Sequence, residues 1–144
     1  MYDDDRIDEG VPAPLAALLR DPDDPRPVRI VPCVCAGCGG RTFTALVGES
    51  AAARECAGCA RRAFIADSEE YWGPEFWEEE GEPGRAGCPC GGEEFEAAVA
   101  FSVDGDGAVR WVTLGLRCVA DGDCGVYADW KIDYLPTDHL FALV

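Results

Sequence analysis

The chain has 144 residues and is 48% hydrophobic, which suits one ordinary globular domain or two small modules. Its 28 acidic and 12 basic residues give a formal net charge of −16. Such an acidic surface repels phosphate backbones and disfavours DNA or RNA as a partner. No apolar run approaches the roughly 18 residues of a membrane span. We expect a protein without a membrane segment whose acidic surface keeps it soluble or attracts a basic protein.

Residues 1–32 form an acidic segment that holds six of the ten prolines, so we expect it to be mostly irregular. One short helix is predicted in the stretch PAPLAALLRD, where Leu15, Leu18 and Leu19 follow helical spacing and two prolines suit a helix start. We expect this helix to pack a small apolar stripe on the body. A docking helix for a partner is the alternative.

The chain contains nine cysteines, which would predict disulfides in a secreted protein. Its opening, MYDDDRIDEG, has neither the positive region nor the apolar run of a signal peptide. We therefore expect a cytoplasmic protein, in which closely spaced cysteines more often bind metal than form disulfides.

From Cys33 onward, the sequence shows two copies of one plan. Residues 33–67 contain CAGCGGRTF and then ECAGCARRAFIAD, and residues 88–144 contain CPCGGEEF and then RCVADGDCGVYAD. Each copy has a cysteine pair, Gly-Gly, two residues and a phenylalanine, Phe43 or Phe95. A second cysteine pair, an aromatic residue and Ala-Asp follow. This matched order predicts an internal repeat of two modules.

The second module has the clearest strand pattern. Apolar residues alternate from Phe95 to Val103 and again at positions 112, 114 and 116, which predicts two strands. The tetrapeptide DGDG at 104–107 predicts the hairpin turn between them. A calcium loop is the alternative, but the other oxygen ligands of an EF-hand are missing. A final aromatic strand is expected before Pro136.

The first module has four cysteines at C-x2-C-x17-C-x2-C, the spacing of a zinc site: Cys35, Cys38, Cys56 and Cys59. A C-x2-C turn places two thiolates on one tetrahedral metal, and Gly39 and Gly40 let backbone amides approach the sulfurs. Cys33 forms a C-x-C with Cys35 and is the alternative ligand in its place. We favour Cys35 because C-x2-C is the commoner spacing of two cysteines that bind one metal ion. Cys33 is then a bystander that does not bind the metal.

The second module offers four cysteines at the less usual spacing C-x-C-x27-C-x5-C: Cys88, Cys90, Cys118 and Cys124. We assign them a second Zn²⁺, giving two ions per chain. Both sets resemble the zinc-ribbon class, in which two cysteine knuckles at the ends of β-hairpins clamp one ion. The resemblance implies a small β-rich fold of two tandem ribbon-like modules. Iron in a rubredoxin-like electron carrier is the alternative, since four thiolates suit both metals.

Residues 68–87 form an acidic bridge between the modules. Two aromatic pairs lie in this bridge: Tyr71, Trp72, Phe76 and Trp77. They are expected either to cover the thin cores of the modules or to form a partner-binding patch, whose acidic rim would select a basic surface.

Sites closed by four cysteines stabilise a fold and leave no position for a reactive water. The lone histidine, His139, is expected in a surface or capping role, and no nucleophile motif or phosphate loop occurs. We therefore expect a non-catalytic, zinc-stabilised module that binds a basic protein, such as an inhibitor, an immunity-type factor or an adaptor. The alternatives are a rubredoxin-like redox protein and a nucleic-acid-associated ribbon factor, the latter if four arginines cluster: Arg41, Arg54, Arg61 and Arg62.

Overall fold

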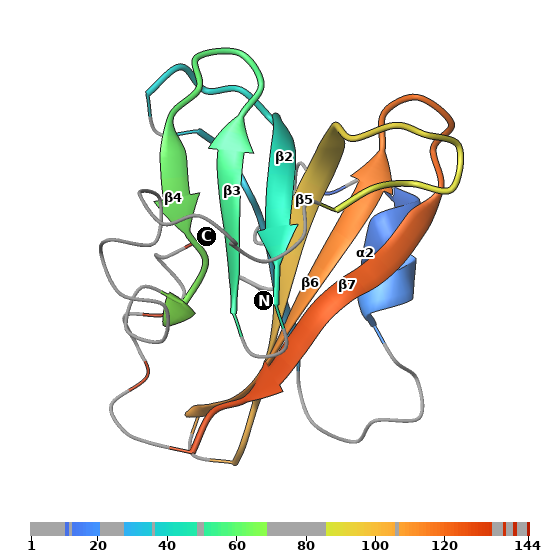
Figure 1. Cartoon of the computed structure of the whole chain (residues 1–144). Coiled ribbons are helices and arrows are strands. Elements are labelled where there is room, and N and C mark those ends of the chain that lie inside the picture. The colour runs from blue at the N-terminus through green and yellow to red at the C-terminus, as the bar shows by residue number, and fades with distance from the viewer. Residues whose placement is uncertain are drawn as a thin grey trace.

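The computed structural model describes residues 11, 13–20, 28–35, 37–48, 51–68, 86–105, 107–133, 137, 140 and 144. These residues form one short helix and a seven-stranded antiparallel sheet (Figure 1). None of the described helices is long and apolar enough to cross a membrane. Several sequence-based calls lie outside the described residues: Tyr71, Trp72, Phe76, Trp77 and His139.

The sheet runs in the order β4-β3-β2-β5-β6-β7, and β1 also pairs with β5. Its strands are β1 (Val28–Pro32), β2 (Thr42–Val47), β3 (Ala52–Cys56), β4 (Arg62–Phe64), β5 (Phe95–Val103), β6 (Val109–Cys118) and β7 (Cys124–Lys131). The predicted β-rich character is confirmed, and the two strands predicted in the second half are β5 and β6. Residues 33–67 and 88–144 contribute to one sheet, because Phe43 of β2 pairs with Phe95 of β5.

Strand β1 lies in the segment that we expected to be mostly irregular, and the expectation is wrong for Val28–Pro32. This strand pairs with residues 98–102 along one edge of β5, and β2 pairs with residues 95–96 on the same edge. The chain advances from Pro32 to Thr42 while its partner on β5 moves only from Ala98 to Glu96. The intervening residues therefore loop out of an almost continuous line of pairing, and this loop carries the first cysteines.

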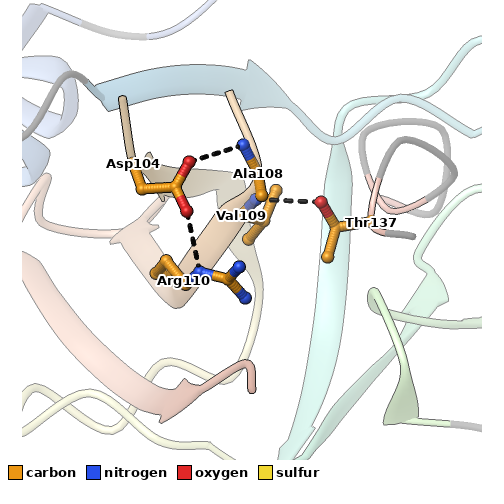
Figure 2. A network of polar contacts seen from close by, with 5 residues as sticks. All are labelled: Asp104, Ala108, Val109, Arg110 and Thr137. Atoms are coloured by element: carbon orange, nitrogen blue, oxygen red, sulfur yellow. Dashed lines mark hydrogen bonds and ion pairs between the residues drawn. The ribbon is translucent and has the colours of Figure 1, made fainter. Parts of the chain in front are cut away.

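A turn joins β5 to β6, as the DGDG stretch predicted. The carboxylate of Asp104 accepts hydrogen bonds from the backbone N–H of Ala108, over 3.1 Å, and from Nε of Arg110, over 3.0 Å (Figure 2). Beside them, the backbone N–H of Val109 donates to Oγ1 of Thr137 over 2.9 Å (Figure 2). Both oxygens of Asp104 are thus engaged within the hairpin, which supports the turn and not a calcium loop.

Buried side chains form two cores, and the smaller one lies under the helix. The larger core contains five of the largest fully buried side chains of the sheet: Phe43, Phe95, Phe101, Leu114 and Leu116. The smaller core joins two helical leucines to one face of β1 and β5: Leu15, Leu19, Ile30, Ala98 and Ala100. Successive residues of β5 thus serve different cores, because neighbouring side chains of a strand point to opposite faces.

The predicted helix is α2 (Ala13–Leu19), which packs against β6 and β7 (Figure 1). A Cβ atom at Gly115 of β6 would lie 2.9 Å from side-chain atoms of both Leu15 and Leu19, so glycine is needed for this close approach. Leu18, which we expected in the same stripe, is 42% exposed. The apolar stripe of the helix therefore consists of Leu15 and Leu19.

Two buried side chains form hydrogen bonds between segments that are far apart in the chain. Trp130 of β7 is buried, and its Nε1 donates to Oδ1 of Asp67 over 2.9 Å. Arg54 of β3 is also buried, with its guanidinium 4.6 Å from the centre of the Phe43 ring, and it donates to the carbonyl of Val144 over 2.7 Å. The aromatic C-terminal strand expected from the sequence therefore supplies core contacts through Trp130.

Candidate metal centres

Four turns, which we call knuckles, carry the candidate ligands: residues 35–40, 56–61, 88–92 and 118–123. In three of them, the backbone N–H of the first cysteine donates to a carbonyl five residues later, over 2.8 Å: Cys35 to Gly40, Cys56 to Arg61, and Cys118 to Asp123. The third knuckle in chain order is one residue shorter, so Cys88 donates to Gly92. The sequence spacing thus translates directly into the size of each turn.

Each knuckle turns through one residue with a positive φ angle: Gly39 at 74°, Ala60 at 65°, Gly91 at 97° and Gly122 at 79°. Glycine adopts this left-handed conformation without strain, because it has no Cβ. Ala60 is the exception, and its backbone carries strain that the other three knuckles avoid.

The knuckles gather around one pair of residues, Phe43 and Phe95, which pair with each other across β2 and β5. On its other side, Phe43 pairs with Cys56 of β3, and Phe95 pairs in the same way with Cys118 of β6. Strands β2 and β5 begin just after one knuckle, and β3 and β6 end in another. The four loops therefore lie at the same end of the sheet, where these strands begin or finish, seen at the top of Figure 1.

In the first centre, the structure brings together the four predicted cysteines, whose sulfurs all lie within 4.8 Å of one another: Cys35, Cys38, Cys56 and Cys59. The sulfurs of Cys35 and Cys59 are 3.5 Å apart, and those of Cys38 and Cys56 are 3.6 Å apart. A tetrahedral ion with bonds of about 2.3 Å separates its sulfur ligands by about 3.8 Å. The group can therefore hold a metal ion.

Backbone amides favour thiolates in this first centre. Hydrogen bonds from the N–H of Cys38, with a smaller contribution from Gly37, lower the pKa of Cys35 to about 6 against the opposing effect of desolvation. The N–H groups of Cys59 and Gly58 lower the pKa of Cys56 in the same way. Since the thiolate is the form that binds metal, the knuckle backbone prepares these sulfurs as ligands.

Cys33 does not belong to this group. It is buried in the larger core, and its backbone N–H donates to the carbonyl of Ala97 over 2.9 Å, which continues the pairing of β1 with β5. Burial raises the pKa of Cys33 to about 11, although the charge of Arg54 opposes the shift. Cys33 therefore remains a neutral thiol in the core.

In the second centre, three cysteines and one aspartate offer ligand atoms within 4.8 Å of one another: Cys88, Cys90, Cys118 and Asp121. The sulfurs of Cys90 and Cys118 are 3.7 Å apart, and Oδ2 of Asp121 lies 3.5 Å from the sulfur of Cys88. A tetrahedral zinc ion separates a sulfur and an oxygen ligand by about 3.5 Å. This group can therefore hold a metal ion through three sulfurs and one oxygen.

Cys124, which the sequence analysis assigned as the fourth ligand, does not lie in this group, and Asp121 lies there in its place. Cys124 begins β7 and pairs with Arg117, the neighbour of Cys118 on β6. Paired residues point to the same face of a sheet and successive residues to opposite faces, so Cys118 and Cys124 point apart. Cys124 packs instead against the smaller core, under α2.

The sequence contains a signal for Asp121 that a search for cysteines alone passes over. Cys118 and Asp121 have the same two-residue separation as Cys56 and Cys59, in the corresponding knuckle. The backbone N–H of Asp123 donates to Oδ1 of Asp121 over 3.0 Å and is the largest influence that lowers the pKa of this carboxyl. Asp121 is therefore a carboxylate at neutral pH and offers this group an anionic oxygen.

The second glycine of each Gly-Gly pair packs against sulfur. A Cβ atom at Gly40 would lie 3.2 Å from the sulfurs of both Cys38 and Cys56, and one at Gly92 would lie 2.9 Å from the sulfur of Cys118. Glycine at these positions leaves room for the ligands.

Comparison of the chain with protein-family models, with curated proteins and with solved structures gives no match. What the fold and the two centres define is a small antiparallel β protein with two groups of residues that can each hold a metal ion.

Proposed function

We propose that the protein is a non-catalytic binding module whose fold is stabilised by two zinc ions, one in each centre. The observation that carries this proposal is the pair of four-residue groups, whose ligand atoms lie within 4.8 Å of one another and include pairs 3.5 to 3.7 Å apart. Zinc suits tetrahedral sites rich in thiolates. Four protein ligands leave no position for a reactive water, so the ions would act on the fold and not on a substrate.

We further infer that the two halves are zinc-ribbon-like modules that repeat one plan. In both halves, a knuckle precedes a phenylalanine, and that phenylalanine pairs with the first cysteine of the next knuckle. The hydrogen bonds from Cys56 and Cys118 within these second knuckles are also the same. These shared contacts support a repeat, in addition to the matched order of residues.

The proposed partner is a basic protein. Residues 68–144 carry 17 acidic and four basic residues, whereas residues 33–67 carry three acidic and four basic ones. The negative charge is therefore concentrated on the bridge and the second half, where it would attract a basic surface and speed association at low salt. The aromatic residues of the bridge would supply the buried anchors: Tyr71, Trp72, Phe76 and Trp77.

The nucleic-acid alternative depended on a surface cluster of four arginines, and two observations weigh against it. Arg54 is buried against Phe43, so it adds no charge to the surface. Arg62 forms an ion pair with Glu55, with Nε 2.9 Å from the carboxylate. Cysteine-bound iron in a redox protein remains the second candidate, because the same sulfurs suit iron.

Elemental analysis of the purified chain tests the metal part of the proposal. We expect two zinc ions per chain. A chain that carries mostly iron would support the redox function, and a metal-free chain with disulfides would contradict the proposal.

The binding part is tested by affinity capture from the native host, followed by measurements on the captured partner. We expect a basic protein whose association rate falls steeply with salt. Trp77→Ala should weaken its binding by about 2 kcal/mol or more, the scale of an interface hot spot, without changing the melting temperature. If this substitution instead melts the protein and leaves the affinity intact, the bridge is part of the core.

A further inference from the structure

The two candidate centres differ mainly in one ligand. Cys59 and Asp121 each follow the first cysteine of their knuckle at the same separation, and each completes a group of ligand atoms within 4.8 Å. The backbone hydrogen bonds of the two knuckles are the same. The difference is therefore chemical: a thiolate closes the first centre, and a carboxylate closes the second.

Asp121 lies where a ligand from solution can reach it. The residue is exposed, and so are Val119 and Ala120 before it. The N–H of Asp123 donates to Oδ1 of Asp121 over 3.0 Å, so a carboxylate that leaves the metal keeps a hydrogen-bond partner. Cys59 is exposed as well, so access alone does not distinguish the two centres.

Ligand strength does distinguish them. Zinc is a borderline-soft ion that binds thiolates tightly, and a carboxylate is a weaker base and a harder donor. Three sulfurs hold the ion of the second centre whether or not Asp121 is bound. The carboxylate is therefore the ligand of the two centres that leaves most readily.

We propose that an external thiol displaces Asp121 from the metal of the second centre, while the first centre stays closed. The metal–oxygen bond breaks, a metal–sulfur bond forms, and the proton of the thiol passes to solvent. One anionic ligand replaces another, so the charge of the metal and its four ligands and all oxidation states stay the same. The displaced Asp121 keeps its negative charge, so the protein with the bound thiolate is one unit more negative, and one proton has passed to solvent. This inference rests on metal binding in the proposed function and adds an exchangeable position to it.

Metal release to a coloured chelator, 4-(2-pyridylazo)resorcinol, tests whether the two centres lose their ions at different rates. The chain loaded with two zinc ions should release one ion at least about tenfold faster than the other, the scale on which one change in the ligand surroundings alters metal affinity. Asp121→Cys should remove the fast phase, and the reciprocal control Cys59→Asp should speed the slow one. Release of both ions in one phase would overturn the proposal, as would a fast phase that survives in Asp121→Cys.

Cobalt(II) substitution with 2-mercaptoethanol as the probe tests the external thiolate itself. The thiolate-to-cobalt absorption grows with the number of bound thiolates, so the thiol should raise the band of the parent toward that of Asp121→Cys. The Asp121→Cys chain should not respond. A parent spectrum that the thiol leaves unchanged would overturn the proposal.

The loaded metal content separates failure of this inference from failure of the proposed function. A chain that binds two ions of equal lability contradicts the inference alone, whereas a chain that binds none contradicts both. If Asp121→Cys does not fold by circular dichroism, the parent and Cys59→Asp still decide between one phase and two.

Discussion

The two halves of the sheet differ in the length of their strands and in the candidate metal centre that each carries. Strands β2, β3 and β4 have six, five and three residues, whereas β5, β6 and β7 have nine, ten and eight. The half with short strands carries the four-cysteine centre, and the half with long strands carries the centre that includes Asp121. From this difference in strand length we expect the half with the shorter strands to depend more on a bound metal ion for its stability.

Removing both metals should give the largest effect and should expose this difference. A structural zinc site contributes on the order of 10 kcal/mol to folding. With a strong chelator present, we expect amide protection to be lost throughout β3 and β4 and to persist in the centres of β5 and β6. Hydrogen exchange followed by mass spectrometry measures this. Equal loss in both halves would contradict this expectation.

Loss of a single ligand should rank next. Asp121→Ala should weaken metal binding at the second centre by about tenfold or more, because one of four ligands is lost. Cys124→Ser is the matched control and should retain both ions, since Cys124 lies on the other face of the sheet. Isothermal titration of the metal-free chains compares the two. If Cys124→Ser loses an ion while Asp121→Ala keeps both, the assignment from the sequence was right.

Crowding of the sulfurs should have a smaller effect that differs between the halves. A Cβ atom at Gly92 would lie 2.9 Å from the sulfur of Cys118, whereas one at Gly40 would lie 3.2 Å from its nearest sulfurs. Overpacking of this kind costs about 1–3 kcal/mol. We expect Gly92→Ala to lower the stability of the loaded chain more than Gly40→Ala does. Chemical unfolding at saturating zinc measures both, and the reverse order would contradict the geometry.

The smallest expected effect concerns the strained knuckle. Ala60 has a φ of 65°, where the other three knuckles have glycine. Ala60→Gly should stabilise the loaded chain by about 1 kcal/mol, because left-handed backbone costs an L-residue about that much. Gly122→Ala is the mirror change and should destabilise it. Thermal unfolding should show melting temperatures that move in opposite directions.

Local patterns in the sequence were sufficient for the helix and for the hairpin of β5 and β6. Leucine spacing located α2, and the alternation from Phe95 together with DGDG located the hairpin. Each of these features depends on residues close together in the chain. Strand β1 is different, because Val28–Pro32 becomes a strand by pairing with β5, about seventy residues away, among prolines that favour irregular structure.

The candidate ligands show the same limit. The C-x2-C spacing identified the whole first group, because each of its two knuckles carries two of the four cysteines. In the second group, Cys124 was chosen for its residue type, although its pairing with Arg117 turns it away from Cys118. That orientation depends on the register between β6 and β7, which the spacing of cysteines does not contain. The position of Asp121 within the knuckle, at the same separation as Cys59 in its own knuckle, matches the group that the structure forms.

The pairing of β1 with β5 also bears on which strand edges the sheet exposes. Unpaired strand edges are templates for aggregation, and a nine-residue strand such as β5 would be a long one. Strands β1 and β2 share that edge between them. The new edge belongs to β1, where Arg29 is exposed and Pro32 has no backbone N–H to donate. Among the described residues, the long edge of β5 is thus paired, and the edge that β1 presents contains a proline, which disfavours the addition of a further strand there.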